Sequence, residues 1–578
     1  MDRLICFLLV AGLFAAPALA QDRLEPAKLP PDTAFYLYWR GLAPQSQWSH
    51  VNSLLALWND PDFLPFRAAL AEEIFSNSEK KDPRKQLTPA DLQEIASLLE
   101  SPILVGAVEQ PKTAAAADQK SPAKAHSPDN SFFVVDISGK QALFQKLEQR
   151  WEQNSSDAPI ITKFNIGDIP AEKVVGKTDT RFRARAGHYA INAGRRALLE
   201  RILARLTGSE AKGAQLGEVA EFREAQKHME PDGLVEIFLR IPNVADFVPS
   251  APSGQLQFDG RGFVRALHVD SLRAFAGSLK LNGPSTRMRF ALLGDPAPGG
   301  IFDLFAGGDA PFSTLALAPA DTLSFNAFQA DFSAFYETLR RAAASALPPN
   351  TQGNVDMYEG MIASLIGMKP LEALQLLTGE VASLSTGTDF APENDLFVVG
   401  IRKKPDVLRL LRTMMEERMS GERVVGDVTY MKISLSGAQS QAGVAQWDFY
   451  YLAATPNLLL GARKNETLQA AVARAQPADS PSSGGLASQP AFLQARSRFP
   501  QKLNSIGFAD FTRIHWPQVR DRLVAEAQKA GAVKSANAGL SIERLKQLDF
   551  TVFGRHLHTL ASASWKDSAG VNWDAWIE

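Results

Sequence analysis

The amino-acid sequence predicts an α+β protein made of two tandem copies of a mostly antiparallel sheet covered by helices. Five motifs recur in the same order, at offsets between 259 and 289 residues. In addition, segments that alternate apolar and polar residues lie next to one another along the chain, as the strands of antiparallel hairpins do. The chain of 578 residues is long enough for two such units, and its 45% hydrophobic content is ordinary for a globular protein.

Residues 1–20, MDRLICFLLVAGLFAAPALA, have the features of a cleavable signal peptide. Arg3 gives a basic start, residues 4–14 form an apolar run too short to span a bilayer, and Ala18 and Ala20 form a small-x-small cleavage site. We therefore expect export to the periplasm or the medium, with no transmembrane segment left after cleavage. An uncleaved membrane anchor is the alternative.

The cysteine content argues against disulfide bonds in the exported chain, and the net charge argues against polyanionic partners. The only cysteine, Cys6, would leave with the leader, so core packing rather than disulfide bonds must hold the protein together. The net charge of −2 gives the whole molecule no general attraction for polyanions, so we expect no nucleic-acid partner.

The motif Pro-x-Asp-Thr opens each predicted unit and is followed by an aromatic-rich strand. It occurs in LPPDTAFYLYW, which begins at Leu29, and in APADTLSFNAF, which begins at Ala318. An aspartate in such a turn can bond to the backbone two residues further on, which favours the start of a strand. We predict a first unit over residues 29–312 and a second over residues 317–578.

The later motifs keep the same order in both units. FVVDISGK at residue 133 returns as FVVGIRKK at 397, IGDIPAEKV at 166 as VGDVTYMKI at 425, GRRALLERILARL at 194 as RKNETLQAAVARA at 463, and EFREA at 221 as AFLQA at 491. A single shared motif would be weak evidence, but an ordered series predicts a duplicated unit of about 270 residues.

Local patterns predict the elements within the units. Residues 87–99 and 142–151 have the apolar spacing of amphipathic helices, and residues 181–191 alternate as one strand. The chain should end in a hairpin that turns at residues 568–570 and packs Trp573 and Trp576 inward.

Three segments interrupt this pattern. Residues 111–130 and 476–490 are rich in Ala, Pro, Ser, Gly or Lys without an apolar period, so we expect flexible loops there. Residues 294–312 contain the glycines and prolines of a linker, but Ile301, Phe302, Leu304 and Phe305 predict that this linker packs on the protein.

A leader, a Pro-x-Asp-Thr turn, an aromatic strand and strand–helix units ending in FYYLAATPNLLLGARKNETLQAAV together resemble an uncharacterised family of exported bacterial envelope proteins. Members of that family carry duplicated α+β units behind a signal peptide or anchor. The resemblance covers most of the mature chain. It implies a compartment and an architecture, but no reaction and no functional residue.

Catalytic, metal and cofactor signatures do not stand out in the sequence. AEKVVGKT at residue 171 fits a relaxed phosphate-loop pattern, but a strand-like segment follows where the phosphate site needs a helix. We expect no cofactor, no metal site and no catalytic residue that can be named. An enzyme is still an alternative, because the acids of glycosidases have no reliable local signature.

Arginines gather in one part of the first unit. Arg181, Arg183 and Arg185 alternate with small or apolar residues, so they should line one strand face, with Arg195 and Arg196 nearby. Guanidinium groups in a row can bind phosphates or carboxylates. The alternative is a sheet face on which each arginine pairs with an acidic neighbour.

These observations favour an exported bacterial envelope protein that works by binding or as a scaffold rather than by catalysis. Its partner would be an unidentified envelope component, with peripheral contact to an anionic membrane surface through the five arginines. The alternatives are an exported hydrolase with an unrecognised acidic site, and a carrier of a lipid or another apolar ligand.

Overall fold

The computed structural model describes residues 24–42, 51–67, 97–109, 128–153, 159–176, 180–208, 214–242, 248, 258–296, 298–305, 311–348, 351–434, 449–476, 484–531 and 542–578. The expected leader lies outside these residues. So do residues 111–127 and 477–483 of the two predicted loops, and residues 87–96 of one predicted helix.

The chain divides into two compact units. Unit 1 comprises Met1–Ile241 and Arg273–Leu293, and unit 2 comprises Pro242–Leu272 and Gly294–Glu578. The division differs from the predicted boundary at residue 312, because the segments on either side of Arg273–Leu293 pack with unit 2. For example, the backbone N–H of Asp259 donates to the carbonyl of Ala346 at 2.7 Å.

Unit 1 contains a sheet in which every described strand pairing is antiparallel. The strand order is β10-β9-β8-β1-β2-β3-β7-β6-β5-β4. The strands are β1 (Thr33–Trp39), β2 (Ile103–Val108), β3 (Ser131–Asp136), β4 (Ile160–Ile166), β5 (Ile169–Val175), β6 (Thr180–Ala186), β7 (Tyr189–Ala193), β8 (Val235–Arg240), β9 (Ala274–Asn282) and β10 (Ser285–Leu293).

Unit 2 has the same strand order, position for position. The order is β20-β19-β18-β11-β12-β13-β17-β16-β15-β14, again antiparallel throughout the described pairings. The strands are β11 (Thr322–Gln329), β12 (Leu377–Thr386), β13 (Asp395–Ile401), β14 (Met419–Val425), β15 (Val428–Ser434), β16 (Phe449–Ala454), β17 (Leu458–Ala462), β18 (Ser505–Asp510), β19 (Thr559–Lys566) and β20 (Gly570–Ile577). The predicted duplication is supported by this shared order and stays a prediction.

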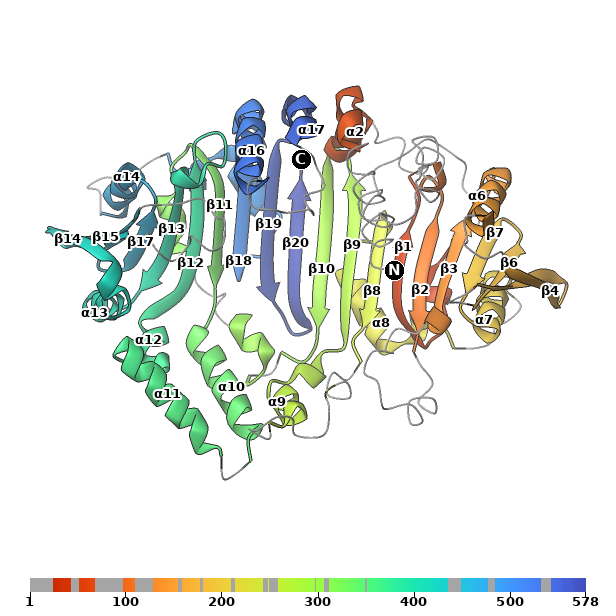
Figure 1. Cartoon of the computed structure of the whole chain (residues 1–578), viewed down its shortest axis with the longest axis horizontal. Helices are drawn as coiled ribbons and strands as arrows, with labels where there is room; N and C mark the ends of the chain where they lie inside the picture. The colour runs from red at the N-terminus through yellow and green to blue at the C-terminus, as the bar shows by residue number, and fades with distance from the viewer. Residues whose placement is uncertain are drawn as a thin grey trace. The chain divides into compact units, whose positions relative to one another are not determined.

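Helices complete the mixed α+β fold that the sequence predicts (Figure 1). Those of unit 1 are α2 (Ser53–Asn59), α6 (Gln141–Gln153), α7 (Arg196–Leu206) and α8 (Ala220–His228). Those of unit 2 are α9 (Gly260–Ala266), α10 (Phe332–Ser345), α11 (Gly353–Ile366), α12 (Pro370–Gln375), α13 (Lys404–Met415), α14 (Asn465–Ala475), α15 (Pro490–Arg496), α16 (Trp516–Gly531), α17 (Ile542–Gln547) and α18 (Thr551–His556). Within the described residues, no helix is both long enough and apolar enough to cross a bilayer.

The motif that opens each unit forms the same turn twice. The hydroxyl of Thr33 donates to the carbonyl of Pro30 at 2.7 Å, and that of Thr322 donates to Pro319 at 2.7 Å. The threonine therefore closes the turn, whereas the sequence predicts this role for the aspartate. A threonine hydroxyl does so because it can reach a nearby carbonyl without leaving an extended backbone.

The IGDIPAEKV and VGDVTYMKI motifs form matching hairpins. Ile166 pairs with Ile169 across the β4–β5 turn, and Val425 pairs with Val428 across the β14–β15 turn. Each turn contains a Gly-Asp pair whose glycine has a positive φ, 56° at Gly167 and 59° at Gly426. Glycine is suited to both places because it adopts this backbone conformation without strain.

One predicted strand is wrong in its extent. Residues 181–191 do not form a single strand but belong to β6 and β7, with Ala186 paired to Tyr189 across a tight turn. Gly187 has a φ of 58°, which lets the chain reverse there. Residues on both sides of the turn alternate, but the apolar positions change phase there, from even numbers up to Ala186 to odd numbers from Tyr189. They do so because Ala186 and Tyr189, which pair across the turn, are three residues apart and project from the same face.

Each unit has its own packed core. In unit 1, Leu37 and Trp39 of β1 pack with Val105, Phe144 and Val235. The core of unit 2 includes Phe325 of β11 together with Leu460, Leu468, Phe492 and Phe508.

The linker and the final hairpin form as predicted, but Trp573 and Trp576 of the hairpin are only half-buried and project from opposite faces of β20. The linker forms a short 3₁₀ helix, η10 (Ile301–Phe305), in which Phe302 is buried and Phe305 lies edge-on to Trp573. The predicted helix at residues 142–151 and the final hairpin are confirmed by α6 and β19–β20.

Candidate functional site

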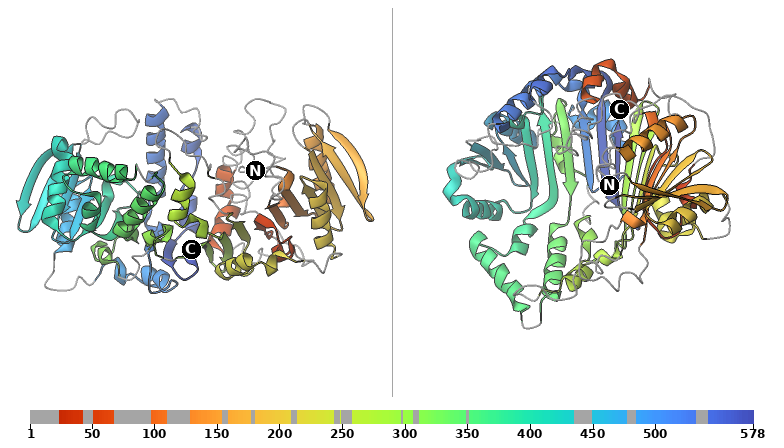
Figure 2. Two further views of the ribbon diagram at one scale, coloured as in Figure 1. Left: turned by 90° about the horizontal axis from the view of Figure 1, so that it is seen from below. Right: turned by 45° about the vertical axis from the view of Figure 1, so that its right-hand side comes forward.

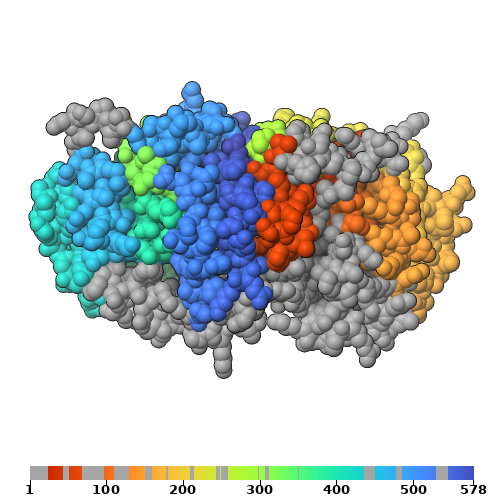
Figure 3. All heavy atoms as spheres, turned by 90° about the horizontal axis from the view of Figure 1, so that it is seen from above, coloured from red at the N-terminus to blue at the C-terminus, as the bar shows by residue number. Residues whose placement is uncertain are grey.

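The arginine strand β6 has the predicted alternation. Arg183 pairs across the sheet with Glu172 of β5 and with Asn192 of β7, which places these side chains on one face. Arg181 and Arg185, two residues away on either side, project from this same face. The strands and helices of this part of unit 1 reach the molecular surface, orange to yellow in Figure 3.

Carboxylates contact Arg183 and Arg185 of this strand. The Nε of Arg183 donates to Glu172 at 2.7 Å, and one of its terminal nitrogens lies 3.8 Å from Glu148 of α6. Arg185 donates to the other oxygen of Glu148. The Glu148 side chain is only 12% exposed, so it pairs with both arginines at the covered base of this face. These contacts reduce the positive charge that an external anion would meet.

The structure does not bring Arg196 to the strand arginines. Its guanidinium lies 4.8 Å from the centre of the Phe164 ring and pairs with Glu200 of α7 at 2.8 Å. Phe164 pairs with Ala171 of β5, whereas Arg183 pairs with Glu172, the next residue of β5. Because successive strand residues project from opposite faces, Phe164 lies on the face opposite to Arg183. Arg195 immediately precedes α7, and its backbone carbonyl accepts from the N–H of Leu199 at 3.1 Å. Arg196 is thus on a different face from Arg181, Arg183 and Arg185.

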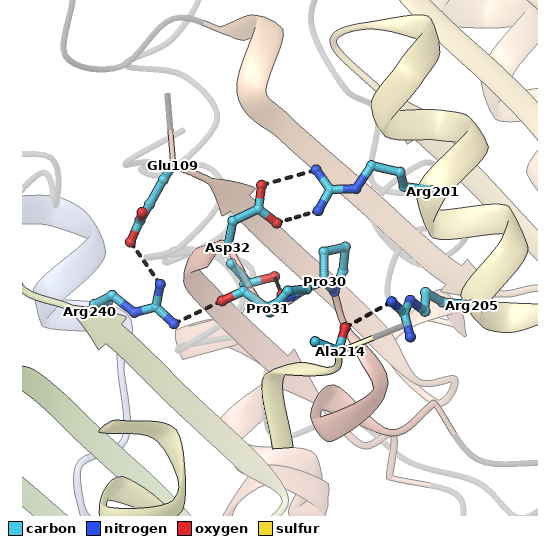
Figure 4. Close-up of polar contacts among 9 residues, drawn as sticks. Pro30, Pro31, Asp32, Glu109, Arg201, Arg205, Ala214 and Arg240 are labelled. Carbon is cyan, nitrogen blue, oxygen red and sulfur yellow. Dashed lines mark hydrogen bonds and ion pairs between the residues drawn. The ribbon is translucent and has the colours of Figure 1, made fainter. Parts of the chain in front are cut away.

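Other arginines of unit 1 brace the opening turn (Figure 4). Arg201 of α7 forks onto both carboxylate oxygens of Asp32, with one distance of 3.0 Å. Arg240 of β8 donates to the carbonyl of Pro31 at 2.9 Å and to Glu109 at 2.7 Å. Arg205 donates to the carbonyl of Ala214 at 2.8 Å. These contacts hold the turn, the helix and two strands together, so we interpret them as structural.

The phosphate-loop pattern has no helix to complete it in the described chain. Residues 171–175 of the pattern lie in β5, Lys177 and Thr178 lie outside the described residues, and the next described residues form β6. Among the described residues, no group of three His, Cys, Asp or Glu side chains is arranged to hold a metal ion.

A different surface has properties that the sequence analysis did not identify. Helix α11 exposes a set of large apolar side chains to solvent, with exposed fractions of 51% for Met357, 47% for Tyr358, 56% for Met361, 44% for Ile362 and 73% for Leu365. We call these five residues the α11 apolar face. At 100° per residue they cover one continuous arc of the helix. Exposed apolar clusters of this size on soluble domains commonly mark contact sites.

Polar contacts fix which way α11 faces. Glu359 accepts from Arg340 at 2.8 Å and from the hydroxyl of Tyr336 at 2.8 Å, both on α10. Burial, followed by this bond to Glu359, raises the pKa of Tyr336 to about 12, so the phenol stays a donor at neutral pH. Ile366, seven residues further on the same side, packs against the buried cluster that includes Met368 and Val407. Both views of Figure 2 show α10, α11 and α12, in green, lying together.

The sequence does contain a signal for this helix. Met357, Met361 and Leu365 are spaced by four residues, as are Tyr358 and Ile362. Such a stripe normally indicates the buried side of a helix. Its direction depends on the Glu359 contacts with α10, which the spacing alone does not reveal.

No family model matches this chain, and no curated protein matches it. Two crystal structures of a protein designated TP0453 show a weak likeness. Crystal form III has a TM-score of 0.19 and 11% identity, over 48% of this chain and 82% of that one. Crystal form I has a TM-score of 0.18 and 11% identity, over 47% and 80% respectively. Similarity at this level supports no conclusion about fold or function.

Proposed function

We propose that the protein is an exported component of the bacterial envelope that works by binding, as a scaffold, through the α11 apolar face. The observation that carries this proposal is the exposure of five large apolar side chains on one helix of unit 2. Water is a poor environment for such a face, so a binding partner that covers it gains the free energy of apolar burial.

The anchoring of α11 supports a binding role further. Arg340 and Tyr336 hold the polar side of α11 against α10, so the apolar side is displayed by a folded element. A rigid display reduces the conformational entropy that a partner's binding would otherwise cost. The export and envelope location rest on the leader and on the family resemblance.

Contact with an anionic membrane through the arginines remains a prediction with less support. Glu148 and Glu172 neutralise much of the charge on the β6 face, and Arg196 lies on the other face. A hydrolase or a lipid carrier also remains a prediction, and no arrangement among the described residues favours either.

Site-specific photocrosslinking tests the proposal. A photoreactive amino acid is placed at Met361, and separately at Leu493 of α15, which is 52% exposed in the same unit. In cells that express the protein, irradiation should give a defined adduct from position 361 and none from position 493. Adducts that are equally weak from both positions would overturn the proposal.

A further inference from the structure

We propose that the α11 apolar face binds the same face of a second copy of this chain, as an antiparallel pair of α11 helices. This inference rests on the proposed binding role and identifies the partner. The chemistry of α11, its residue spacing and its exposed area support it independently.

The residue spacing of α11 is suited to a two-fold axis near Met361. Met357 lies four residues before Met361, and Leu365 lies four residues after it. When two such helices cross antiparallel at this point, Met361 meets the partner's Met361, and Met357 meets the partner's Leu365. A symmetric interface requires this kind of self-complementary pattern, because both copies contribute the same patch.

Gly360 has no evident role within a single chain. It lies in the interior of α11, its φ is not positive, and a Cβ built on it would meet nothing within 4 Å. Glycine in a helix interior costs about 1 kcal/mol relative to alanine. At 100° per residue, however, Gly360 lies about 100° around the helix from Met361 and outside the arc of the α11 apolar face, so it is not part of the proposed contact.

The exposed area is sufficient for self-association. With roughly 200 Å² for each large apolar side chain, the α11 apolar face presents about 500 Å² per copy. Two copies would bury about 1,000 Å² in total, at the lower limit for a specific interface. We therefore expect a reversible dimer rather than a permanent one.

The charges of α11 disfavour a lipid surface as the occupant. Its charged residues, Asp356 and Glu359, are both acidic, and residues 353–366 contain no lysine or arginine. Helices that lie on membranes generally have a polar face rich in lysine and arginine, which attracts anionic lipids.

Sedimentation velocity of the purified full chain over a range of concentrations provides the first test. We expect a monomer–dimer equilibrium for the unmodified chain. Met361→Glu places two like charges on the axis and should weaken dimerisation by at least about tenfold. Leu493→Glu is the matched control and should leave the equilibrium unchanged. A chain that stays monomeric throughout, or a Met361→Glu variant that dimerises as well as the control, would overturn the inference.

Gly360→Leu gives a test that does not depend on added charge. The new side chain enters open space in the monomer, so the folded chain should be retained or become more stable by thermal melting. Dimerisation should be unchanged, because Gly360 lies outside the α11 apolar face. A strongly weakened dimer would contradict the predicted interface.

A disulfide test locates the axis. Cys6 is replaced by serine, and a single cysteine is introduced as Met361→Cys or, for control, Leu493→Cys. Mild oxidation should link two chains rapidly at position 361 and slowly at position 493. Equal rates would contradict the axis.

The crosslinking experiment separates this inference from the proposed function. An adduct from position 361 with the mass of two chains supports both. An adduct with a lipid or with a different protein, together with a monomer in sedimentation, overturns self-association and leaves the binding role standing. The lack of any adduct overturns the binding role itself.

Discussion

In unit 1, Phe222 of α8 meets Phe238 of β8 edge-on, with ring centres 5.3 Å apart and an angle of 86°. In unit 2, Phe492 of α15 meets Phe508 of β18 at 5.5 Å and 80°. In each unit, a residue of the opening strand pairs with the strand phenylalanine, and this residue differs between the units. It is Tyr36 in unit 1 and Phe325 in unit 2.

The hydroxyl of Tyr36 is the feature by which these two aromatic clusters differ, and the fold does not require it. Both rings are fully buried, but the hydroxyl of Tyr36 has no hydrogen-bond partner among the described residues. Burial, followed by the nearby charge of Glu236, raises the pKa of Tyr36 well above its ordinary value. The shape of the ring is therefore shared by both units, whereas the polar atom is an addition that unit 2 does without.

The largest expected effect tests whether the two aromatic clusters are equivalent in energy. Phe222→Ala and Phe492→Ala should each destabilise their own unit by about 3–5 kcal/mol, because each leaves a cavity between helix and sheet. Hydrogen exchange resolved by segment would measure the loss in each unit separately. If one substitution destabilises its unit far more than the other, the two aromatic clusters share a geometry but not a contribution to stability.

A smaller effect tests the buried hydroxyl. Phe325→Tyr should destabilise unit 2 by about 1–3 kcal/mol, because it places an unsatisfied hydroxyl in a core without one. Tyr36→Phe should leave unit 1 equally or more stable, measured by the same exchange experiment. A marked loss of stability on Tyr36→Phe would reveal a partner for that hydroxyl.

The arginine strand has no counterpart in unit 2, where β16 reads FYYLAA. Arg183→Gln should destabilise unit 1 by about 2 kcal/mol, because Glu148 and Glu172 lose a charged donor at a largely covered position. Lys163→Gln, an exposed change on β4, serves as the control in chemical denaturation. If Arg183→Gln instead abolishes association with anionic vesicles and leaves stability intact, the anion-binding prediction gains support over the structural one.

The smallest effect concerns the two Gly-Asp hairpins. Gly167→Ala and Gly426→Ala should each cost about 1 kcal/mol, because an alanine is strained at positive φ although it would meet no neighbour. Gly421→Ala in β14 also enters open space, but at an ordinary φ, so it should be neutral or slightly stabilising. Local exchange rates of the hairpins would show these differences, and equal rates for all three variants would contradict the strain argument.

The order of elements could be predicted from the sequence because glycine, proline and the alternating pattern mark strands and turns locally. Gly167 and Gly426 each mark a hairpin, and the Pro-x-Asp-Thr turn marks both opening strands. The segments on both sides of Gly187 alternate, and the prediction of one strand did not account for the change of phase between them, from apolar residues at even numbers to apolar residues at odd numbers.

The candidate site was less predictable because it depends on contacts between distant residues. Arg185 pairs with Glu148, which lies 37 residues earlier on α6. One sequence shows that arginines gather but does not show which carboxylates reach them. Similarly, the apolar spacing of α11 predicts a stripe of apolar side chains. The stripe is exposed to solvent because Glu359, on the other side of the helix, bonds to α10, and the sequence does not show these bonds.

The position of β1 in its sheet has a consequence for how the chain folds. Its neighbours are β2, which follows early, and β8, and Arg40 at the end of β1 meets Glu236 of β8 across 196 residues of sequence. Strand β11 stands in the same relation to β18. Neither sheet can close around its opening strand until nearly the whole unit has been made, and such distant pairings fold slowly. Under the proposed export, a chain that stays unfolded through most of its synthesis would have time to be translocated before it folds.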